Sequence, residues 1–196
     1  MPEMPPLDRM LRKNRLASFT LVELLTVMAI IAILAALTLS AASEVMNKAK
    51  RSRATTEIQA ISTALEGYKT DNGSYPPSDG VLTTNTPYSL YDGTSLNYQT
   101  NSTLLYIALT GTNYFDAVPP TGVKNYMPSL KINQIGNPTG PYSYIKDPWN
   151  YSYGYSTGTV ANYPYNGTGF FDLWSTGGLL AAQVNTNAWL SNWQQQ

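Results

Sequence analysis

The first strong pattern along the chain is an apolar run over residues 24–43. Ile, Leu, Ala, Val and Met fill it, and it contains no charge, proline or glycine. An unbroken helix is therefore expected. At about 1.5 Å per residue, such a helix crosses a hydrocarbon core about 30 Å thick. The run predicts a single membrane-spanning segment.

The pattern changes after residue 43, but nothing in the sequence would stop the helix there. Apolar side chains now recur in steps of three and four residues: Ile58, Ile61, Leu65 and Tyr68. This periodicity predicts an amphipathic helix over 44–71 that packs one side on a globular head. Asn72-Gly73, with prolines just beyond, marks its end. We therefore expect one helix of about 50 residues, with a membrane half and an amphipathic half.

The remaining residues, 72–196, are rich in Tyr, Asn, Thr, Ser, Gly and Pro, which suits strands and turns. Variable loops with one short helix ending at Gly111 are expected over 78–140. An antiparallel sheet is expected over 141–176, followed by a C-terminal loop at 177–196. The three strands of this sheet are indicated by short alternations of apolar and polar residues: 142–145, 151–155 and 169–174. A long helix laid on a small antiparallel sheet gives an α+β fold.

Composition excludes several classes of function. The 196 residues carry a net charge of zero and include neither cysteine nor histidine. Disulfides, thiolate nucleophiles and the usual neutral-pH general base are therefore absent, and no nucleic-acid partner is expected. Asp71, Asp147 and Asp172 fall at a helix end, a turn and a strand edge, where acids have ordinary structural roles. The chain is not expected to be an enzyme.

A single acid, Glu23, lies at the edge of the apolar run. A carboxylate there costs roughly 2–3 kcal/mol on insertion scales, so its presence requires a physical reason. Three interpretations stay open: a plain membrane anchor, a secretory signal peptide cut near residues 40–42, or a chain cut before Phe19. In the third case a new α-amine, from the same chain or a neighbour, offsets the cost of the Glu23 carboxylate.

Basic residues flank both ends of the apolar run: Arg9, Arg12, Lys13 and Arg15 before it, and Lys48, Lys50, Arg51 and Arg53 after it. Charge alone therefore leaves the orientation open. Because the first flank usually dominates, the head is expected to face outward. Residues 1–18 are interpreted as a basic leader and 19–43 as the transmembrane half of the helix.

The segment Ser18-Phe19-Thr20-Leu21-Val22-Glu23-Leu24-Leu25 resembles the cleavage and methylation motif of type IV prepilins and type II secretion pseudopilins. The resemblance implies that a prepilin peptidase cuts between Ser18 and Phe19 and N-methylates Phe19. It also implies that Glu23 is the acid needed for methylation and assembly. Ser18 stands where the family usually has glycine.

Three further segments look like the major, G-type pseudopilin: 64–76 at the helix exit, 146–150 with its Asp-Pro-Trp turn, and 171–178 in a late strand. The resemblance implies a type IV pilin-like fold and a homo-oligomeric filament. The implied partners are prepilin peptidase, minor pseudopilins and the secretion platform of the bacterial inner membrane. The chain would cross that membrane once, with its head in the periplasm.

Calcium is the one cofactor that the resemblance raises, because G-type pseudopilins carry a C-terminal calcium loop with aspartates. Here the stretch after Ser175 contains no Asp or Glu, whereas calcium takes about six to eight oxygens, usually including carboxylates. Weak candidates are Leu173, Ser175, Asn185 and Asn187. The other interpretation is a loop without metal that Trp189 and Trp193 hold down.

The expected function is that of a structural subunit of a type II secretion pseudopilus. One alternative is a type IV pilin for adhesion, motility or DNA uptake, although such pilins often close the head with a disulfide. An alternative of another class is a monomeric membrane-anchored binding module, whose exposed tyrosines could stack on sugars or bases.

Overall fold

The computed structural model describes residues 19–78, 96–157, 165–167, 169–179 and 188–193. The chain divides into two units, Met1–Val45 and Met46–Gln196. The helix α1, Leu21–Asn72, contributes residues to both units. It ends where the sequence predicts: the Gly73 backbone N donates to the Lys69 carbonyl (2.7 Å), with Gly73 at φ +80, a helix end that glycine favours.

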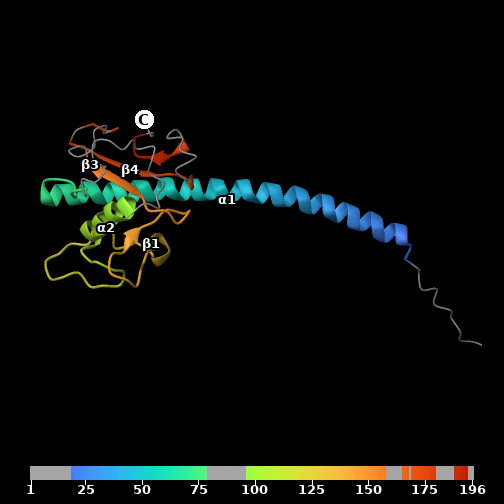
Figure 1. Cartoon of the computed structure of the whole chain (residues 1–196), viewed down its shortest axis with the longest axis horizontal. Coiled ribbons are helices and arrows are strands. Elements are labelled where there is room, and N and C mark those ends of the chain that lie inside the picture. The colour runs from blue at the N-terminus through green and yellow to red at the C-terminus, as the bar shows by residue number, and fades with distance from the viewer. Residues whose placement is uncertain (1–18, 79–95, 158–164, 168, 180–187, 194–196) are drawn as a thin grey trace, which may run out of the picture. The chain divides into compact units, whose positions relative to one another are not determined.

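The second unit adds a further helix and short strands (Figure 1). They are α2 (Leu96–Thr110), the 3-10 turn η2 (Ile132–Gln134), β1 (Ile135–Gly136), β2 (Tyr144–Ile145), β3 (Gly154–Thr157), β4 (Phe171–Ser175) and β5 (Leu190–Ser191). The expected helix ending at Gly111 is α2. It begins earlier than its apolar segment indicates because its first turns carry mostly polar residues. The long helix and the antiparallel strands confirm the α+β, pilin-like fold.

The strands form two antiparallel sheets rather than the single sheet that the sequence suggests. β1 pairs with β2, and β4 lies between β3 and β5. The Asp147-Pro148 turn lies between β2 and β3. Its two sides are joined by an isolated bridge between Lys146 and Ser152 and by a hydrogen bond from the Tyr153 backbone N to the Ile145 carbonyl at 3.1 Å.

The hydrophobic core of the second unit lies along one side of α1. Ile58, Ile61 and Leu65 are almost fully buried. They share one cluster with apolar residues of α2, β3 and β4: Leu105, Tyr106, Leu109, Tyr155 and Leu173. The predicted stripe is therefore the face that meets the rest of the head. Figure 1 shows α2, β3 and β4 beside this part of the helix.

A smaller aromatic cluster holds the C-terminal end of the described chain. Trp174 and Trp189 stack with ring centroids 6.0 Å apart, and Tyr98 of α2 meets Trp174 edge-on at 5.7 Å. Gly154 faces Trp174 across the β3–β4 pair, and any side chain at Gly154 would collide with the indole ring. Trp189 therefore belongs to the packed head, as the sequence suggests.

Candidate functional site

The start of α1 is closed by a reciprocal pair of hydrogen bonds between Thr20 and Glu23. The Thr20 backbone N and Oγ1 donate to Glu23 Oε2 at 2.9 and 2.8 Å, and the Glu23 backbone N donates to Thr20 Oγ1 at 3.2 Å. This is a capping box, which satisfies backbone donors that the first helical turn leaves unpaired. The capping role of Thr20 was not predicted from the sequence, although a threonine three residues before a glutamate is the known signal for this cap.

The capping box places the Glu23 carboxylate next to the predicted cleavage point. The backbone nitrogen that it binds belongs to Thr20, one residue after Phe19. No described residue donates a hydrogen bond to the other oxygen, Glu23 Oε1, and the residue is exposed, so that oxygen is available to a donor. Phe19 itself is 68 % exposed, and Ser18 lies outside the described residues. The geometry therefore joins Phe19, Thr20 and Glu23 in one short site.

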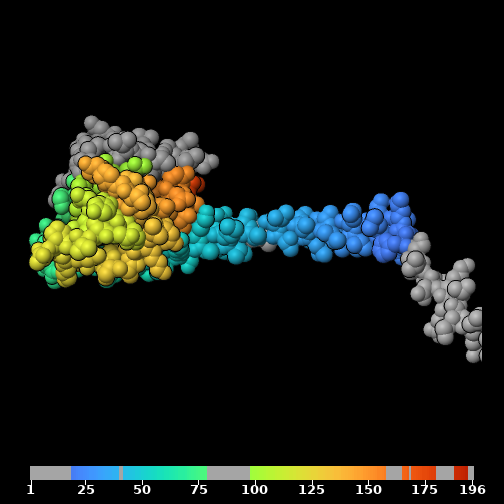
Figure 2. All heavy atoms as spheres, turned by 90° about the horizontal axis from the view of Figure 1, so that it is seen from below, coloured from blue at the N-terminus to red at the C-terminus, as the bar shows by residue number. Residues whose placement is uncertain are grey.

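The first unit leaves its apolar side chains uncovered. Leu21 is 78 % exposed and Leu37 63 % exposed, and α1 is the one helix in the described ranges that is long and apolar enough to cross a membrane. Figure 2 shows this stretch in blue, with its side chains uncovered on the face in view. The Thr26 hydroxyl bonds to a carbonyl of its own helix, so few polar groups need water. Such a surface is stable in lipid or against other helices.

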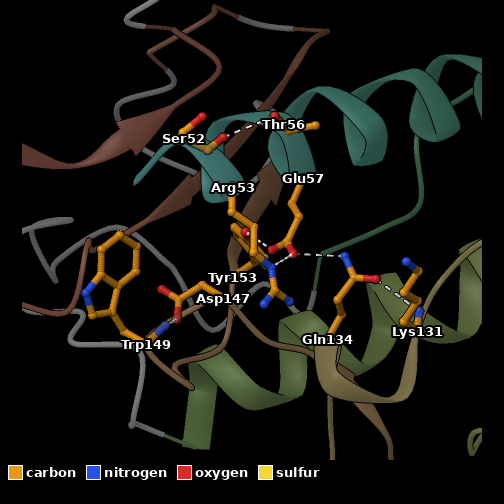
Figure 3. Close-up of polar contacts among 9 residues, drawn as sticks. All are labelled: Ser52, Arg53, Thr56, Glu57, Lys131, Gln134, Asp147, Trp149 and Tyr153. Atoms are coloured by element: carbon orange, nitrogen blue, oxygen red, sulfur yellow. Dashed lines mark hydrogen bonds and ion pairs between the residues drawn. The ribbon is translucent and has the colours of Figure 1, made fainter. Parts of the chain in front are cut away.

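A second polar site lies inside the head, around Glu57 of α1 (Figure 3). Arg53 Nε and Gln134 Nε2 donate to Glu57 Oε1 at 2.7 and 2.9 Å, and Tyr153 Oη donates to Glu57 Oε2 at 2.7 Å. Glu57 is only 8 % exposed. Its carboxylate thus joins α1 to η2 and to Tyr153, the residue before β3. This role was not predictable from the sequence, because Glu57 has the pattern of an ordinary acid on a charged helix.

Asp147 forms the turn that the sequence predicted and also reaches β4. Its Oδ1 accepts hydrogen bonds from the backbone N of Trp149 and of Tyr151, both at 2.9 Å, and its Oδ2 accepts one from Ser175 Oγ at 2.5 Å. Burial raises the pKa of Asp147 to about 6, the hydrogen bonds oppose that rise, and the charge of Glu57 adds to it. These contacts are those of a structural turn.

The aspartates singled out in the sequence bond to separate parts of the head. Asp71 pairs with Lys124 at 2.6 Å on the surface, which lowers the pKa of Asp71. Asp172 is buried and accepts hydrogen bonds from the backbone N of Tyr165 (2.9 Å) and of Asn166 (3.0 Å). Each of these three carboxylates thus makes structural contacts in its own part of the head.

The calcium candidates within the described residues do not fit a metal site. The Leu173 carbonyl accepts a hydrogen bond from the Asn192 backbone N (3.0 Å). Ser175 Oγ bonds to Asp147 and accepts from the Gly177 N (3.1 Å). Asn185 and Asn187 lie outside the described residues, and no group of three His, Cys, Asp or Glu gathers in the part that the structure describes. Arg51 Nη1, a fixed cation, instead donates to the Ala188 carbonyl at 3.2 Å.

A long apolar helix that starts in a capped Thr20-Glu23 site and ends in a small α+β head defines a pilin-type subunit. Comparison with known families agrees. Residues 13–39 match the prokaryotic N-terminal methylation motif, and residues 42–96 match protein G of the type II secretion system. The chain belongs to the family of type IV prepilins and type II secretion pseudopilins.

Individual relatives support the same assignment. The chain is 34 % identical over 118 residues to fimbrial protein EcpB of Eikenella corrodens, covering 58 % of this chain and 72 % of that protein. It is 36 % identical over 72 residues to type II secretion system core protein G of Aeromonas hydrophila, covering 37 % of this chain and 50 % of that protein. The same protein of Pseudomonas aeruginosa gives 38 % identity over 72 residues, 37 % of this chain and 51 % of that protein.

The chain thus spans about half the length of the core protein G relatives that it matches. The resemblance to the G-type pseudopilin is confirmed over residues 42–96. The family is one of structural subunits rather than enzymes. The apolar part of α1 in this chain is consistent with anchoring in the inner membrane.

Proposed function

We propose that this subunit is processed by prepilin peptidase between Ser18 and Phe19, N-methylated at Phe19, and assembled into a helical type II secretion pseudopilus. Before assembly it would rest in the bacterial inner membrane, crossing it once with its head in the periplasm. The observation that carries the proposal is the Thr20–Glu23 box at the tip of an uncovered apolar helix. No catalytic activity is proposed for the chain.

The chemistry of the tip supplies a physical mechanism for assembly. Cleavage would create an ammonium group at Phe19, one residue from the nitrogen that Glu23 already binds. In lipid, an ammonium and a carboxylate attract strongly and offset part of each other's desolvation. Because Oε1 accepts no hydrogen bond from a described residue, it could accept one from the amine of a neighbouring subunit. Such pairing would fix the axial register of the subunits.

Assembly would replace lipid around the helix by neighbouring helices. Lipid tails are as apolar as leucine, so side-chain packing and polar pairing, rather than the hydrophobic effect, would drive this exchange. The inner-membrane secretion platform and minor pseudopilins are proposed as partners in the step. The heads would form the outer layer of the filament.

The test must separate the charge of Glu23 from its capping bonds. Glu23→Gln keeps a capping acceptor but loses the charge, whereas Thr20→Ala removes the two hydrogen bonds of Thr20 Oγ1 and keeps the carboxylate with its backbone hydrogen bond. We expect Glu23→Gln and Glu23→Ala to abolish ordered filaments and Thr20→Ala to retain them, as seen by electron microscopy and by disulfide crosslinking through Ile30→Cys. Ordered filaments from both Glu23 variants would disprove the charge pairing.

Processing has its own test, which is independent of assembly. Mass spectrometry of the native protein should give a chain that begins at methylated Phe19. A chain that retains the leader, or one that begins near residue 42, would refute the proposed cleavage. Glu44→Gln, which changes an exposed acid farther along α1, is the matched control and should be processed and assembled normally.

Two other functions stay testable. The match to the fimbrial protein EcpB covers 58 % of this chain, and it favours a type IV pilin as the second candidate. A secretion ATPase and secretin encoded beside the gene would support the pseudopilus instead. A monomeric membrane-anchored binding module is the third candidate, and monomers alone in the Ile30→Cys crosslinking experiment would support it.

A further inference from the structure

A hollow of about 640 Å³ lies between α2 and the hairpin of β1 and β2. It belongs to the part of the chain beyond residue 96, where the match to protein G ends. Leu104 and Ile107 of α2 give it an apolar wall, the rings of Tyr142 and Tyr144 line it, and Gln99 and Asn137 add side-chain amides. No charged residue is among the described residues that line it.

The frame of this hollow is held by hydrogen bonds that would keep its shape without a ligand. Ser102 Oγ of α2 donates to the Ile145 carbonyl at 2.8 Å and accepts from the Ile145 N at 3.1 Å. Asn137 Nδ2 donates to the Pro141 carbonyl at 3.0 Å. Gly136 lies directly beneath the Tyr144 ring, where a larger residue would collide with it. Both sides of the hollow are thus fixed to the core.

Tyr142 is the least ordinary residue of the lining. Its backbone has φ 76, a conformation that costs energy for any residue with a Cβ. Two hydrogen bonds to the Asn113 carbonyl, from the backbone N of Tyr142 (3.1 Å) and of Ser143 (3.0 Å), hold it there. The side chain gains little burial in return, because it is 67 % exposed. The fold therefore holds an aromatic ring at the rim of a hollow.

We propose that this hollow binds an uncharged saccharide. Aromatic rings that are apolar on their faces and polar at one end suit the C–H faces and hydroxyls of a sugar. The amides of Gln99 and Asn137 can donate to and accept from hydroxyl groups. A charged ligand would find no counter-charge among the described residues of the lining, and a wholly apolar one would not use the remaining hydrogen-bonding capacity of these amides. The open hollow suits a segment of a polysaccharide chain.

The experiment uses the full chain in a detergent without a sugar head group, with maltohexaose, cellohexaose and chitohexaose as probes. Saturation-transfer and protein-observed NMR would measure binding, and we expect at least one probe to bind with a dissociation constant of about 0.1–5 mM. Tyr142→Gly should weaken that binding by about fivefold or more, because the ring contact is lost. Glycine accepts a positive φ, so this variant should fold at least as stably as the parent chain.

Two matched variants complete the experiment. Tyr142→Trp should retain binding because it keeps an aromatic ring, and Tyr114→Ala, which removes an exposed tyrosine outside the lining, should leave it unchanged. Absence of binding by all three probes, or equal binding by Tyr142→Gly, would overturn the proposal. Signals of the lining residues that shift with protein concentration and not with saccharide would assign the hollow to a second copy of the chain, which also overturns it.

Discussion

The two parts of α1 are built from similar apolar residues, yet they differ in what covers them. Before residue 46 the apolar side chains are exposed, as at Ile31 (59 %), whereas in the second part Ile61 and Leu65 are 1 % and 0 % exposed. The first part is apolar on all sides, and the second has one apolar stripe. A stripe can be covered by the chain's own head, but a helix that is apolar all round needs lipid or other subunits.

The acids of the two parts show the same difference. Glu23 bonds within its own helical turn and keeps one oxygen available. Glu57 accepts hydrogen bonds from three side chains, two of them on other elements of the head. A change in the second part should therefore affect folding of the head, and a change in the first should affect assembly. The predictions below test this division, starting from the largest expected effect.

Leu65→Ala should destabilise the head by about 2–5 kcal/mol, since it removes a buried side chain and leaves a cavity. The matched change Ile31→Ala should alter the free energy of unfolding of the head by less than about 0.5 kcal/mol. Chemical unfolding followed by the fluorescence of Trp174 and Trp189 measures both. Equal losses from the two variants would show that the two parts of α1 are not energetically distinct.

This comparison also shows what the sequence could reveal. Residues 24–43 and the stripe through Ile58 and Leu65 are periodic over many turns, so the helix was predictable almost to its end at Asn72. The motif around Glu23 was equally readable, because its signal is local in the sequence. Features that depend on one continuous segment were therefore predictable.

Features that depend on contacts between distant segments were not predictable from the sequence. β1 and β5 have only two residues each, too few to show an alternating pattern. The burial of Glu57 depends on Gln134 and Tyr153, which lie 77 and 96 residues further along the chain. The positive φ of Tyr142 depends on the carbonyl of Asn113. Such contacts become visible only when the chain is folded.

Glu57→Gln should cost about 1–3 kcal/mol, because one of its oxygens becomes an amide group that faces a hydrogen-bond donor. The loss should appear in the free energy of unfolding, measured as for Leu65→Ala. Glu44→Gln, an exposed acid that lies before residue 46, should leave that free energy unchanged. Equal effects at the two positions would contradict the structural role of the Glu57 site.

Asp147 gives the head a pH dependence of defined sign. Its pKa is raised to about 6 in the folded chain, so between about pH 4 and 6 the folded state binds more protons than the unfolded state. The free energy of unfolding should therefore rise as the pH falls from 7 to 4.5, by no more than about 2–3 kcal/mol from this group.

Asp147→Asn keeps an acceptor for the turn and removes the titrating proton. It should flatten this part of the stability profile, measured as unfolding midpoints at several pH values. Asp71→Asn is the control. Pairing with Lys124 lowers the pKa of Asp71, so its contribution would be lost only at lower pH. A profile that keeps its slope in Asp147→Asn would assign the pH dependence to another group.

The smallest effect is expected at Arg51, whose guanidinium joins α1 to the carbonyl of Ala188. Arg51→Ala should reduce global stability by less than about 1 kcal/mol, since the contact is exposed. Locally the effect should be clear: amide hydrogen exchange around 188–193 should accelerate, whereas Lys48→Ala should leave it unchanged. Because the cation at this place is a side chain, EDTA should not alter exchange in the parent chain, and calcium should not restore protection in Arg51→Ala. Protection that depends on calcium would mean that a metal, not Arg51, holds the C-terminal segment.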